Sequence, residues 1–491
     1  MAHTPSKYQA AVYHFIEEGK GNAVVDAVAG SGKSTTLVEA LKKIPAHQSV
    51  LFLAFNKAIV EELKIKVGKT PNVTIMTLHG LGSKTVNRSL WATEINADKY
   101  KSFIYRADAQ GYLIPDCDLD HSELKGFKSN ILQLIDLCRV NLINDKDRAK
   151  ELADKHGLHL LSNEIKYAFK AIKWGLANED EIDFTDMIFF PIIKKMRVEQ
   201  YDYVFIDECQ DLNTCQRELF LKCLKPTGRF IAVGDPQQAI YGFAGADVES
   251  FKILQNLPDT INLPLSVCYR CAEDIIKLAK SIVPHIEARE GAPKGIINKR
   301  AVLSDIEDGD MILCRLVSPL VDVCMGYIKQ GIKAYIKGGD IGANLVRMIQ
   351  NNNRDLMEDV LHALDKKLAK IAVKYAKSTG CDLGTAKESN AYRSYEDKVK
   401  AIEILSADIA RSSSVVNRIL SIFNDKAQGI CLATIHKSKG LECERVFILC
   451  PDKMMLDRAM QIGWMAEQER NLVYVAYTRA KSYLGFITDY E

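Results

Sequence analysis

The sequence predicts an α/β protein with two parallel-sheet domains, each interrupted by a mainly helical insertion. Three observations lead to this fold class. The chain has 491 residues, several times the length of a typical domain of roughly 100–200 residues. Short apolar, β-rich runs alternate with helical patterns, as in a parallel sheet that helices cover on both faces. Two long polar and helical stretches interrupt that alternation.

Two sets of apolar runs, each bounded by turn or helix signals, predict the strands of the two sheets. The first set comprises residues 23–27, 50–55, 73–77, 203–206 and 230–233. The second set comprises residues 311–314, 333–336, 430–435, 446–449 and 484–488. We therefore expect one sheet domain from residues 1–84 and 183–265, and another from residues 266–340 and 415–491.

The helical insertions are expected at residues 85–182 and 341–414. In the second, an apolar stripe recurs at spacings of three to four residues: Leu361, Leu364, Leu368, Ile371 and Tyr375. Four lysines lie off that stripe: Lys366, Lys370, Lys374 and Lys377. These lysines have two interpretations: they form a solvated helix face, or they form a row that binds the phosphates of a DNA duplex.

Composition indicates a soluble globular chain, with 47% hydrophobic and 26% charged residues. No apolar run approaches the roughly 18 residues of a membrane span, and residues 1–20 lack the apolar core of a signal peptide. We therefore expect no membrane partner and a cytoplasmic location. The thirteen cysteines have no disulfide spacing, and Cys268 and Cys271 lack the second pair that a zinc site needs, so reduced thiols are expected.

The net charge of +2 gives no sign of a strongly basic nucleic-acid-binding surface. If nucleic acid is a partner, its contacts must come from a local groove. The motifs therefore carry the functional argument.

A glycine-rich loop follows the first predicted strand. Residues 27–35 read AVAGSGKST, and Ala27 stands where the strict P-loop pattern has glycine. A strand, glycine loop and helix in this order direct backbone N–H groups at phosphates, Lys33 at the β and γ oxygens, and the Ser34 hydroxyl at Mg²⁺. The expected nucleotide-binding residues of the loop are Ala29, Gly30, Ser31, Gly32, Lys33, Ser34 and Thr35.

A second motif ends an apolar strand in paired carboxylates, because residues 203–211 read YVFIDECQD. Asp207 at the strand tip is placed to hold Mg²⁺, and Glu208 can polarise the attacking water. Such a pair alone would indicate a surface turn. Together with the glycine loop it predicts hydrolysis of a nucleoside triphosphate, with ATP and Mg²⁺ as the expected cofactors.

With further motifs in the same order, these residues resemble the UvrD/Rep/PcrA class of superfamily-one helicases over nearly the whole chain. The motifs are Tyr8-Gln9, AVAGSGKST, LAFNKA at 53–58, TLHGL at 77–81, DFTDM at 183–187, IDECQD, VGDPQQAIYGFAGAD at 233–247, CYR at 268–270, ATIHKSKGLE at 433–442 and YVAYTRA at 474–480. LAFNKA and VGDPQQ are most similar to the F-box DNA helicase branch, although nothing resembles an F-box. The resemblance implies two RecA-like motor domains.

The resemblance also implies roles around ATP. Gln9 would hydrogen-bond the adenine edge, Tyr269 would stack on the base, and Glu442 would accept from the ribose hydroxyl. Gln238 would sense the γ-phosphate, and Arg270 and Arg479 of the second domain would approach it as arginine fingers. Hydrolysis between the two domains could then move one against the other.

For nucleic acid, the resemblance implies aromatic platforms and polar loops on both domains. The candidates are Phe55, Asn56, His79, Tyr241, Phe243, Thr434 and His436. Stacking of a base on an aromatic ring contributes about 1–3 kcal/mol and tolerates any sequence. A lone aromatic more often packs in a core, but its place within a motif favours the functional interpretation for Phe55 and Phe243. The expected partners are single-stranded DNA and its junctions with duplex, bound by a monomer.

Three departures from the family pattern concern duplex handling and partner choice. Ala244 stands where the family has arginine after the aromatic residue. The second insertion is short for the family. The chain also ends soon after Arg479, so we expect no C-terminal extension that binds partners.

The resulting hypothesis is an ATP-dependent DNA helicase, with 3′-to-5′ polarity taken from the resemblance alone. The alternative motor is a single-strand translocase that displaces recombinase filaments and unwinds weakly. A nucleotide-gated clamp without turnover is disfavoured because Glu208, Gln238 and both arginines are present, and a nuclease fusion because no further acidic cluster follows. Repair, replication and recombination stay open as pathways, and the compact architecture suits a bacterial or phage-infected cell.

Overall fold

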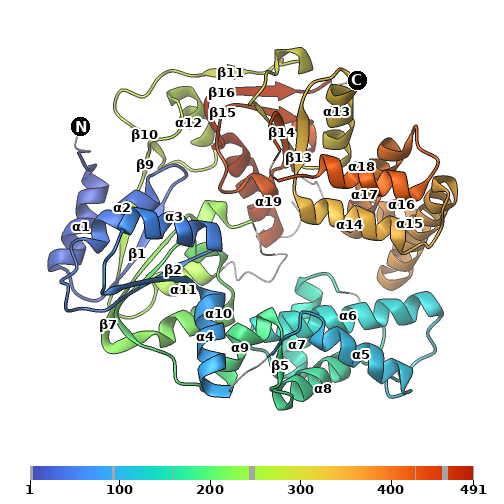
Figure 1. Ribbon diagram of the computed structural model, residues 1–491, viewed down its shortest axis with the longest axis horizontal. Helices are drawn as coiled ribbons and strands as arrows, with labels where there is room; N and C mark the ends of the chain where they lie inside the picture. The colour runs from blue at the N-terminus through green and yellow to red at the C-terminus, as the bar shows by residue number, and fades with distance from the viewer. Residues whose placement is uncertain are drawn as a thin grey trace. The chain divides into compact units, whose positions relative to one another are not determined.

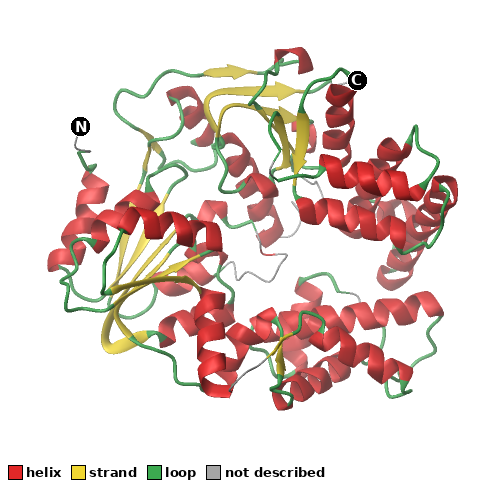
Figure 2. Cartoon of the chain, viewed as in Figure 1, coloured by secondary structure: helices red, strands yellow, loops and turns green. Residues whose placement is uncertain are grey.

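The computed structural model describes residues 4–90, 94–158, 160–240, 242, 249–425, 427–455 and 463–489. Contacts divide the chain into two compact units. The first comprises Met1–Val28 and Gly32–Ser266, and the second Ala29–Ser31 and Val267–Glu491. Each unit contains a parallel sheet with helices (Figures 1 and 2). This confirms the predicted fold class of two RecA-like sheets, each interrupted by a mainly helical insertion.

In the described part of the first unit, six strands form one parallel sheet in the order β3-β2-β6-β7-β1-β8. The strands are β1 (Asn22–Ala27), β2 (Val50–Ala54), β3 (Val73–Thr77), β6 (Tyr201–Ile206), β7 (Leu224–Gly234) and β8 (Thr260–Leu265). All five predicted runs of this set are confirmed, whereas β8 was not predicted. Its sequence TINLPL contains Pro264, which is tolerated here because β8 is an edge strand.

Helices cover both faces of the first sheet (Figure 1). The helices of one face are α1 (Lys7–Glu18), α2 (Lys33–Leu41) and α3 (Lys57–Val67). Those of the other are α4 (Leu78–Leu90), α9 (Phe184–Ile193), α10 (Thr214–Lys222) and α11 (Ser250–Gln255). Successive strand residues point to opposite faces, so the neighbours Val24 and Val25 of β1 pack in different cores.

A helical segment interrupts the first sheet between β3 and β6. Its elements are β4 (Glu94–Ile95), α5 (Lys99–Ala109), α6 (His121–Val140), α7 (Lys146–Lys155), α8 (Glu164–Ala177) and β5 (Glu181–Ile182). Phe127 and Ile131 of α6 belong to the same buried cluster as Leu51 and Val204 of the sheet. The insertion therefore shares a hydrophobic core with the sheet that it interrupts.

The described part of the second unit contains another six-stranded parallel sheet, in the order β11-β16-β15-β12-β14-β13. Its strands are β11 (Ile296–Asn298), β12 (Met311–Cys314), β13 (Ala334–Lys337), β14 (Ile430–Thr434), β15 (Cys443–Leu449) and β16 (Ala480–Ile487). Two short strands, β9 (Val267–Cys268) and β10 (Glu287–Ala288), pair separately. The five predicted runs of the second set are confirmed, and the short edge strand β11 was missed.

The helices of the second unit include α12 (Glu273–Ala279), α13 (Ser318–Lys329) and α19 (Gly463–Tyr477), and its insertion contains α14 (Gly339–Gln350), α15 (Met357–Thr379), α16 (Leu383–Lys387), α17 (Asn390–Ser406) and α18 (Ser412–Ile422). Helix α15 confirms the predicted amphipathic helix, since Leu364 is buried while Lys366, Lys370 and Lys377 are exposed. Lys374 is half-buried. Both interpretations of the lysines stay open.

The described part of the chain contains no helix long and apolar enough to cross a membrane. The thirteen cysteines all lie in that part, and none of them forms a disulfide.

Candidate nucleotide and nucleic-acid site

The expected phosphate-contacting residues of the first unit lie at the carboxyl edge of its sheet. The loop after β1 leads into α2, Asp207 follows β6, and Asp235 follows β7. Strand β7 lies between β1 and β6, so these three strand ends are neighbours. Parallel sheets place their ligand sites at this edge.

The glycine loop presents an uncapped helix start. Gly30 and Gly32 have φ angles of 66° and 78°, a region that side chains disfavour. Gly32 is the N-cap of α2 and has no side chain to accept from the first-turn N–H groups, which can therefore bind phosphate. Ala29 and Ser31 are buried, Ser34 is half-buried and Thr35 is exposed.

Lys33 forms an ion pair with the expected catalytic base. Its Nζ donates to Glu208 Oε1 at 2.8 Å. Burial alone would lower the pKa of Lys33, but the charges of Glu208, Asp207 and Asp235 outweigh burial and raise that pKa above its ordinary value. The group has one cation among three carboxylates. Its excess negative charge fits a site for a divalent cation.

Glu208 is held in an uncommon conformation by neighbouring polar groups. Its φ of 55° lies in the left-handed region, which residues other than glycine seldom adopt. Gln210 Nε2 donates to Glu208 Oε2 at 2.5 Å, and Gln210 Oε1 accepts from the Asp235 backbone N–H at 3.0 Å. Gln210 therefore connects two strand ends, a role that sequence reasoning missed although the residue lies within IDECQD.

Asp235 holds the expected γ-phosphate sensor. Gln238 Nε2 donates to Asp235 Oδ2 at 2.6 Å. Burial raises the pKa of Asp235 to about 6, with Asp26 and Glu208 contributing in the same direction and Lys33 and Gln238 opposing it. Sequence reasoning did not select Asp235, although it lies in the same motif as Gln238.

The expected protein ligands for Mg²⁺ are Ser34 and Asp207. Asp207 is buried, and its Oδ1 accepts from the Glu208 backbone N–H at 2.9 Å. No group of three or more His, Cys, Asp or Glu within the described ranges is arranged to hold a metal ion. Mg²⁺ in nucleotide sites takes most of its ligands from phosphates and water, so one hydroxyl and one carboxylate fit this chemistry.

Gln9 is buried between two helices of the first unit. Its Oε1 accepts from the Ser6 backbone N–H at 3.0 Å, within the capping box of α1. Its Nε2 donates to Thr36 Oγ1 of α2 at 3.1 Å. These two hydrogen bonds fix the orientation of the Gln9 amide.

In the second unit, three expected ATP-contacting residues lie close together. Arg270 Nε donates to Glu442 Oε2 at 2.7 Å, and Lys481 Nζ lies 2.9 Å from Glu442 Oε1. Glu442 precedes β15 and Arg479 precedes β16, which are neighbouring parallel strands. Tyr269 beside Arg270 is half-buried. The pairing of Arg270 with Glu442 was not predicted, and Lys481 was missed.

Arg479 is engaged within its own unit. The side chain is buried, and its guanidinium donates to the carbonyls of Val475 and Leu441, both at 2.9 Å, and to Thr478 Oγ1 at 3.3 Å. These acceptors hold the Arg479 guanidinium in place within the second unit.

The expected nucleic-acid residues of the first unit lie at the same carboxyl edge. Phe55 directly follows β2, and its side chain is 48% exposed. Asn56 is the N-cap of α3, where its side chain accepts from the Ile59 backbone N–H at 3.0 Å. His79 follows β3 and is exposed. Tyr241, Phe243 and Ala244 lie outside the described residues.

Thr434 and His436 of the second unit lie at the carboxyl end of β14, the sheet edge opposite to Glu442 and Arg479. Thr434 is buried, and its hydroxyl accepts from the Lys437 backbone N–H at 3.3 Å. Burial, with Arg315 and Lys437 nearby, lowers the pKa of His436 to about 3. His436 is therefore neutral at physiological pH.

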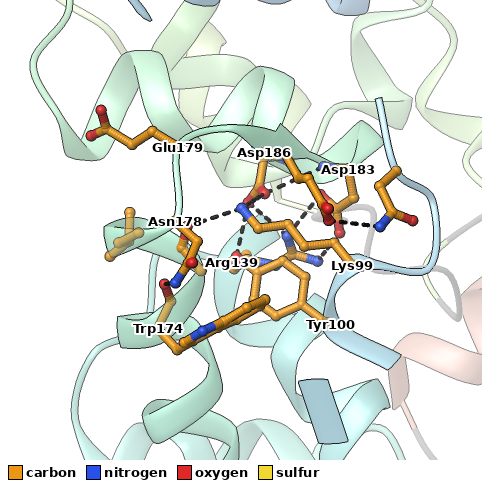
Figure 3. Close-up of polar contacts among 12 residues, drawn as sticks. Lys99, Tyr100, Arg139, Trp174, Asn178, Glu179, Asp183 and Asp186 are labelled. Carbon is orange, nitrogen blue, oxygen red and sulfur yellow. Dashed lines mark hydrogen bonds and ion pairs between the residues drawn. The ribbon is translucent and has the colours of Figure 1, made fainter. Parts of the chain in front are cut away.

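The DFTDM motif belongs to a buried ionic cluster in the first unit (Figure 3). Lys99 Nζ lies 2.8 Å from Asp186 Oδ2, and both side chains are fully buried. Arg139 donates to both Asp183 oxygens and to Asp186 Oδ1, each at 2.8 Å. Tyr100 Oη donates to Asp186 Oδ1 at 3.0 Å. The cluster joins α5 and α6 of the insertion to α9, so these carboxylates fix the insertion to the sheet domain.

A glycine loop between strand and helix, facing an acidic strand end, is the arrangement found in nucleoside triphosphatases. Family comparisons identify the class more closely. Residues 7–259 match the UvrD/REP helicase N-terminal domain, and residues 385–490 match the UvrD-like helicase C-terminal domain. The chain belongs to the UvrD/REP helicase family, which confirms the resemblance inferred from its motifs.

Individual relatives are distant. F-box DNA helicase protein 1 of Schizosaccharomyces pombe is 24% identical over 498 residues, covering 94% of this chain and 55% of that protein. F-box DNA helicase 1 of Gallus gallus is 24% identical, covering 97% and 48%. ATP-dependent DNA helicase PcrA of Staphylococcus epidermidis is 24% identical, covering 57% and 40%. The chain thus spans about half the length of the curated relatives it matches.

Proposed function

We propose that this chain is an ATP-dependent DNA helicase that translocates 3′ to 5′ on single-stranded DNA and couples ATP hydrolysis in two RecA-like domains to duplex unwinding. The observation that carries the proposal is the 2.8 Å pair of Lys33 and Glu208 beside Asp207, at the carboxyl edge of the first sheet. Family membership and the names of the relatives, which are DNA helicases, support the nucleic-acid part.

The residues of the first unit have complementary tasks in this proposal. Lys33 leaves Glu208 to contact the β- and γ-phosphates, and the released Glu208 carboxylate accepts a proton from the attacking water. Gln210 holds Glu208 in place, and Gln238 reports the state of the γ-phosphate. Mg²⁺, when bound by Ser34 and Asp207, would offset negative charge on the phosphates. The backbone N–H groups of the loop orient the nucleotide.

The residues of the second unit would complete the chemistry. Arg270 releases Glu442 and binds the γ-phosphate, and Arg479 binds the same phosphate. The freed Glu442 can accept from a ribose hydroxyl. Gln9 and Tyr269 are proposed to bind the base. The proposal includes two sheet domains, at residues 1–84 with 183–265 and at residues 266–340 with 415–491. It places the insertions at residues 85–182 and 341–414.

The proposed partners are single-stranded DNA and its junctions with duplex, bound by a monomer. The exposed ring of Phe55 supports base stacking. Asn56, His79, Thr434 and His436 are proposed to contact the strand, together with Tyr241 and Phe243. The free cysteines support a reducing compartment, and we keep the cytoplasm of a bacterial or phage-infected cell as the proposed location.

The proposal is tested by steady-state ATP hydrolysis with and without single-stranded oligonucleotide, and by strand displacement on duplexes with a 3′ or a 5′ tail. DNA-stimulated hydrolysis and preference for the 3′ tail are expected. Lys33→Ala should abolish both, whereas Lys43→Ala, which removes an exposed partner of Glu17, should change neither. Absence of DNA-stimulated hydrolysis would refute the proposal. Efficient removal of a recombinase filament with poor strand displacement would favour the translocase instead.

A further inference from the structure

A hollow of about 680 Å³ lies in the first helical insertion, between α5, the loop that follows it and α8. Its apolar walls include Phe103, Leu113, Tyr167 and Trp174. None of the residues assigned above to ATP or DNA contributes to its lining. The hollow is therefore separate from the proposed motor site.

Aromatic and polar contacts hold Trp174, which forms one wall of this hollow. Trp174 stacks on Phe103, with ring centroids 4.4 Å apart and an interplanar angle of 21°, and makes an edge contact with Tyr100 at 6.3 Å. Tyr100 donates in turn to Asp186 of the buried ionic cluster (Figure 3). A Cβ on Gly175 would lie 2.2 Å from Tyr100 Oη, so glycine is needed for this close approach. Contacts within the protein therefore set the position of Trp174 in this wall.

The rim of the hollow is cationic. Arg106, Lys170 and Lys173 line it and are exposed. Among the described lining residues there is no carboxylate. This charge distribution favours an anionic ligand, whereas the walls favour a large apolar group.

A protein segment satisfies both requirements better than a nucleic-acid strand. Sequence-tolerant strand binding uses a series of open aromatic faces. Here the stacking of Phe103 on Trp174 covers one face of each ring, and Tyr167 is buried, so Tyr112 is the one exposed aromatic among the described lining residues. We propose that the hollow is a docking site for a partner protein segment in which one large apolar side chain is flanked by acidic residues. The apolar side chain enters the hollow and contacts its apolar walls, and the acidic residues pair with Arg106, Lys170 and Lys173.

The test is fluorescence anisotropy on the full chain, without ATP or DNA, with a fluorescein-labelled peptide of sequence DDFDD. Saturable binding is expected, and the control peptides DDADD and KKFKK should bind at least about tenfold more weakly because each lacks one of the two required features. The double variant Lys170→Glu with Lys173→Glu should weaken DDFDD binding by about tenfold or more. Lys150→Glu, an exposed lysine of α7 outside the lining, should change it less than about twofold.

A second variant separates packing from charge. Tyr112 lines the hollow and is 66% exposed, so Tyr112→Ala should weaken peptide binding and leave the thermal unfolding midpoint unchanged. Basal ATP hydrolysis should also stay unchanged, because none of these residues belongs to the motor site. No binding of DDFDD, or equal loss in Lys150→Glu, would overturn the proposal. So would a labelled oligo(dT) that binds in place of the peptide and is weakened by the double variant.

Discussion

Replacing Glu208 by glutamine is expected to tighten ATP binding while stopping turnover. The Lys33–Glu208 pair is 2.8 Å long, with side chains 13% and 19% exposed. A hydrogen bond to a charged group contributes about 1.5–3 kcal/mol. Glutamine keeps an acceptor oxygen and loses the charge, so we assign about 1.5 kcal/mol to the change, or about a tenfold lower Kd for ATP. Turnover should fall by about 10²–10⁴-fold because the base is lost.

The affinity is measured by titration with a fluorescent ATP analogue, and the turnover by phosphate release. Glu61→Gln is the matched control, since Glu61 forms a 2.9 Å pair with Lys64 on the surface of α3 and should leave both quantities unchanged. If Glu208→Gln bound ATP several times more weakly than the parent, Glu208 would be a ligand of the nucleotide complex and the assignment of the base would be wrong.

Further expectations concern the buried charges and the arginines. Lys99→Met should lower the free energy of unfolding by about 3–5 kcal/mol, because it leaves buried carboxylates without their cationic partner. Lys101→Met replaces an exposed side chain of the same helix and should lower that free energy by less than about 1 kcal/mol. Chemical denaturation measures both. The raised pKa of Asp235, about 6, means that the native protein holds this proton more tightly than the unfolded chain, so the residue's contribution to stability falls as pH rises from about 4 to 6. Asp235→Asn should therefore raise the unfolding midpoint at pH 7.5 more than at pH 4.5, and an equal shift would contradict the buried charge. Arg270→Ala and Arg479→Ala should each lower DNA-stimulated hydrolysis by about 10³-fold or more with little change in ATP affinity, and their combined effect should be less than additive.

The strands of both sheets could be predicted because buried parallel strands are continuous apolar runs. The exceptions have physical reasons. Strand β8 lies at a sheet edge, where polar residues and Pro264 are tolerated, and β11 is too short to form a recognisable run. Periodicity also predicted α15, because the apolar stripe of that helix is buried or half-buried while most of its lysines are exposed.

The residues at the phosphate loop and the acidic strand could be predicted because their function requires a fixed local spacing. The partners that hold them could not. Gln210 connects strand ends that are distant in sequence, and Lys481 reaches Glu442 across neighbouring strands. The ionic cluster is a similar case, because Lys99 and Arg139 meet Asp186 across separations of 87 and 47 residues. Nothing in the local sequence distinguishes these cations from surface residues.

That ionic cluster limits which segments could replace the first insertion. Its cations come from α5 and α6, whereas the carboxylates of Asp183 and Asp186 come from the N-cap and the first turn of α9 in the sheet domain. One further carboxylate, Asp136, comes from α6 itself. A chimaera that exchanged residues 85–182 for the matching segment of a relative would bury the carboxylates of Asp183 and Asp186 against foreign helices. A donor segment that lacks equivalents of Lys99 and Arg139 should therefore graft poorly, even where its length and helical content match.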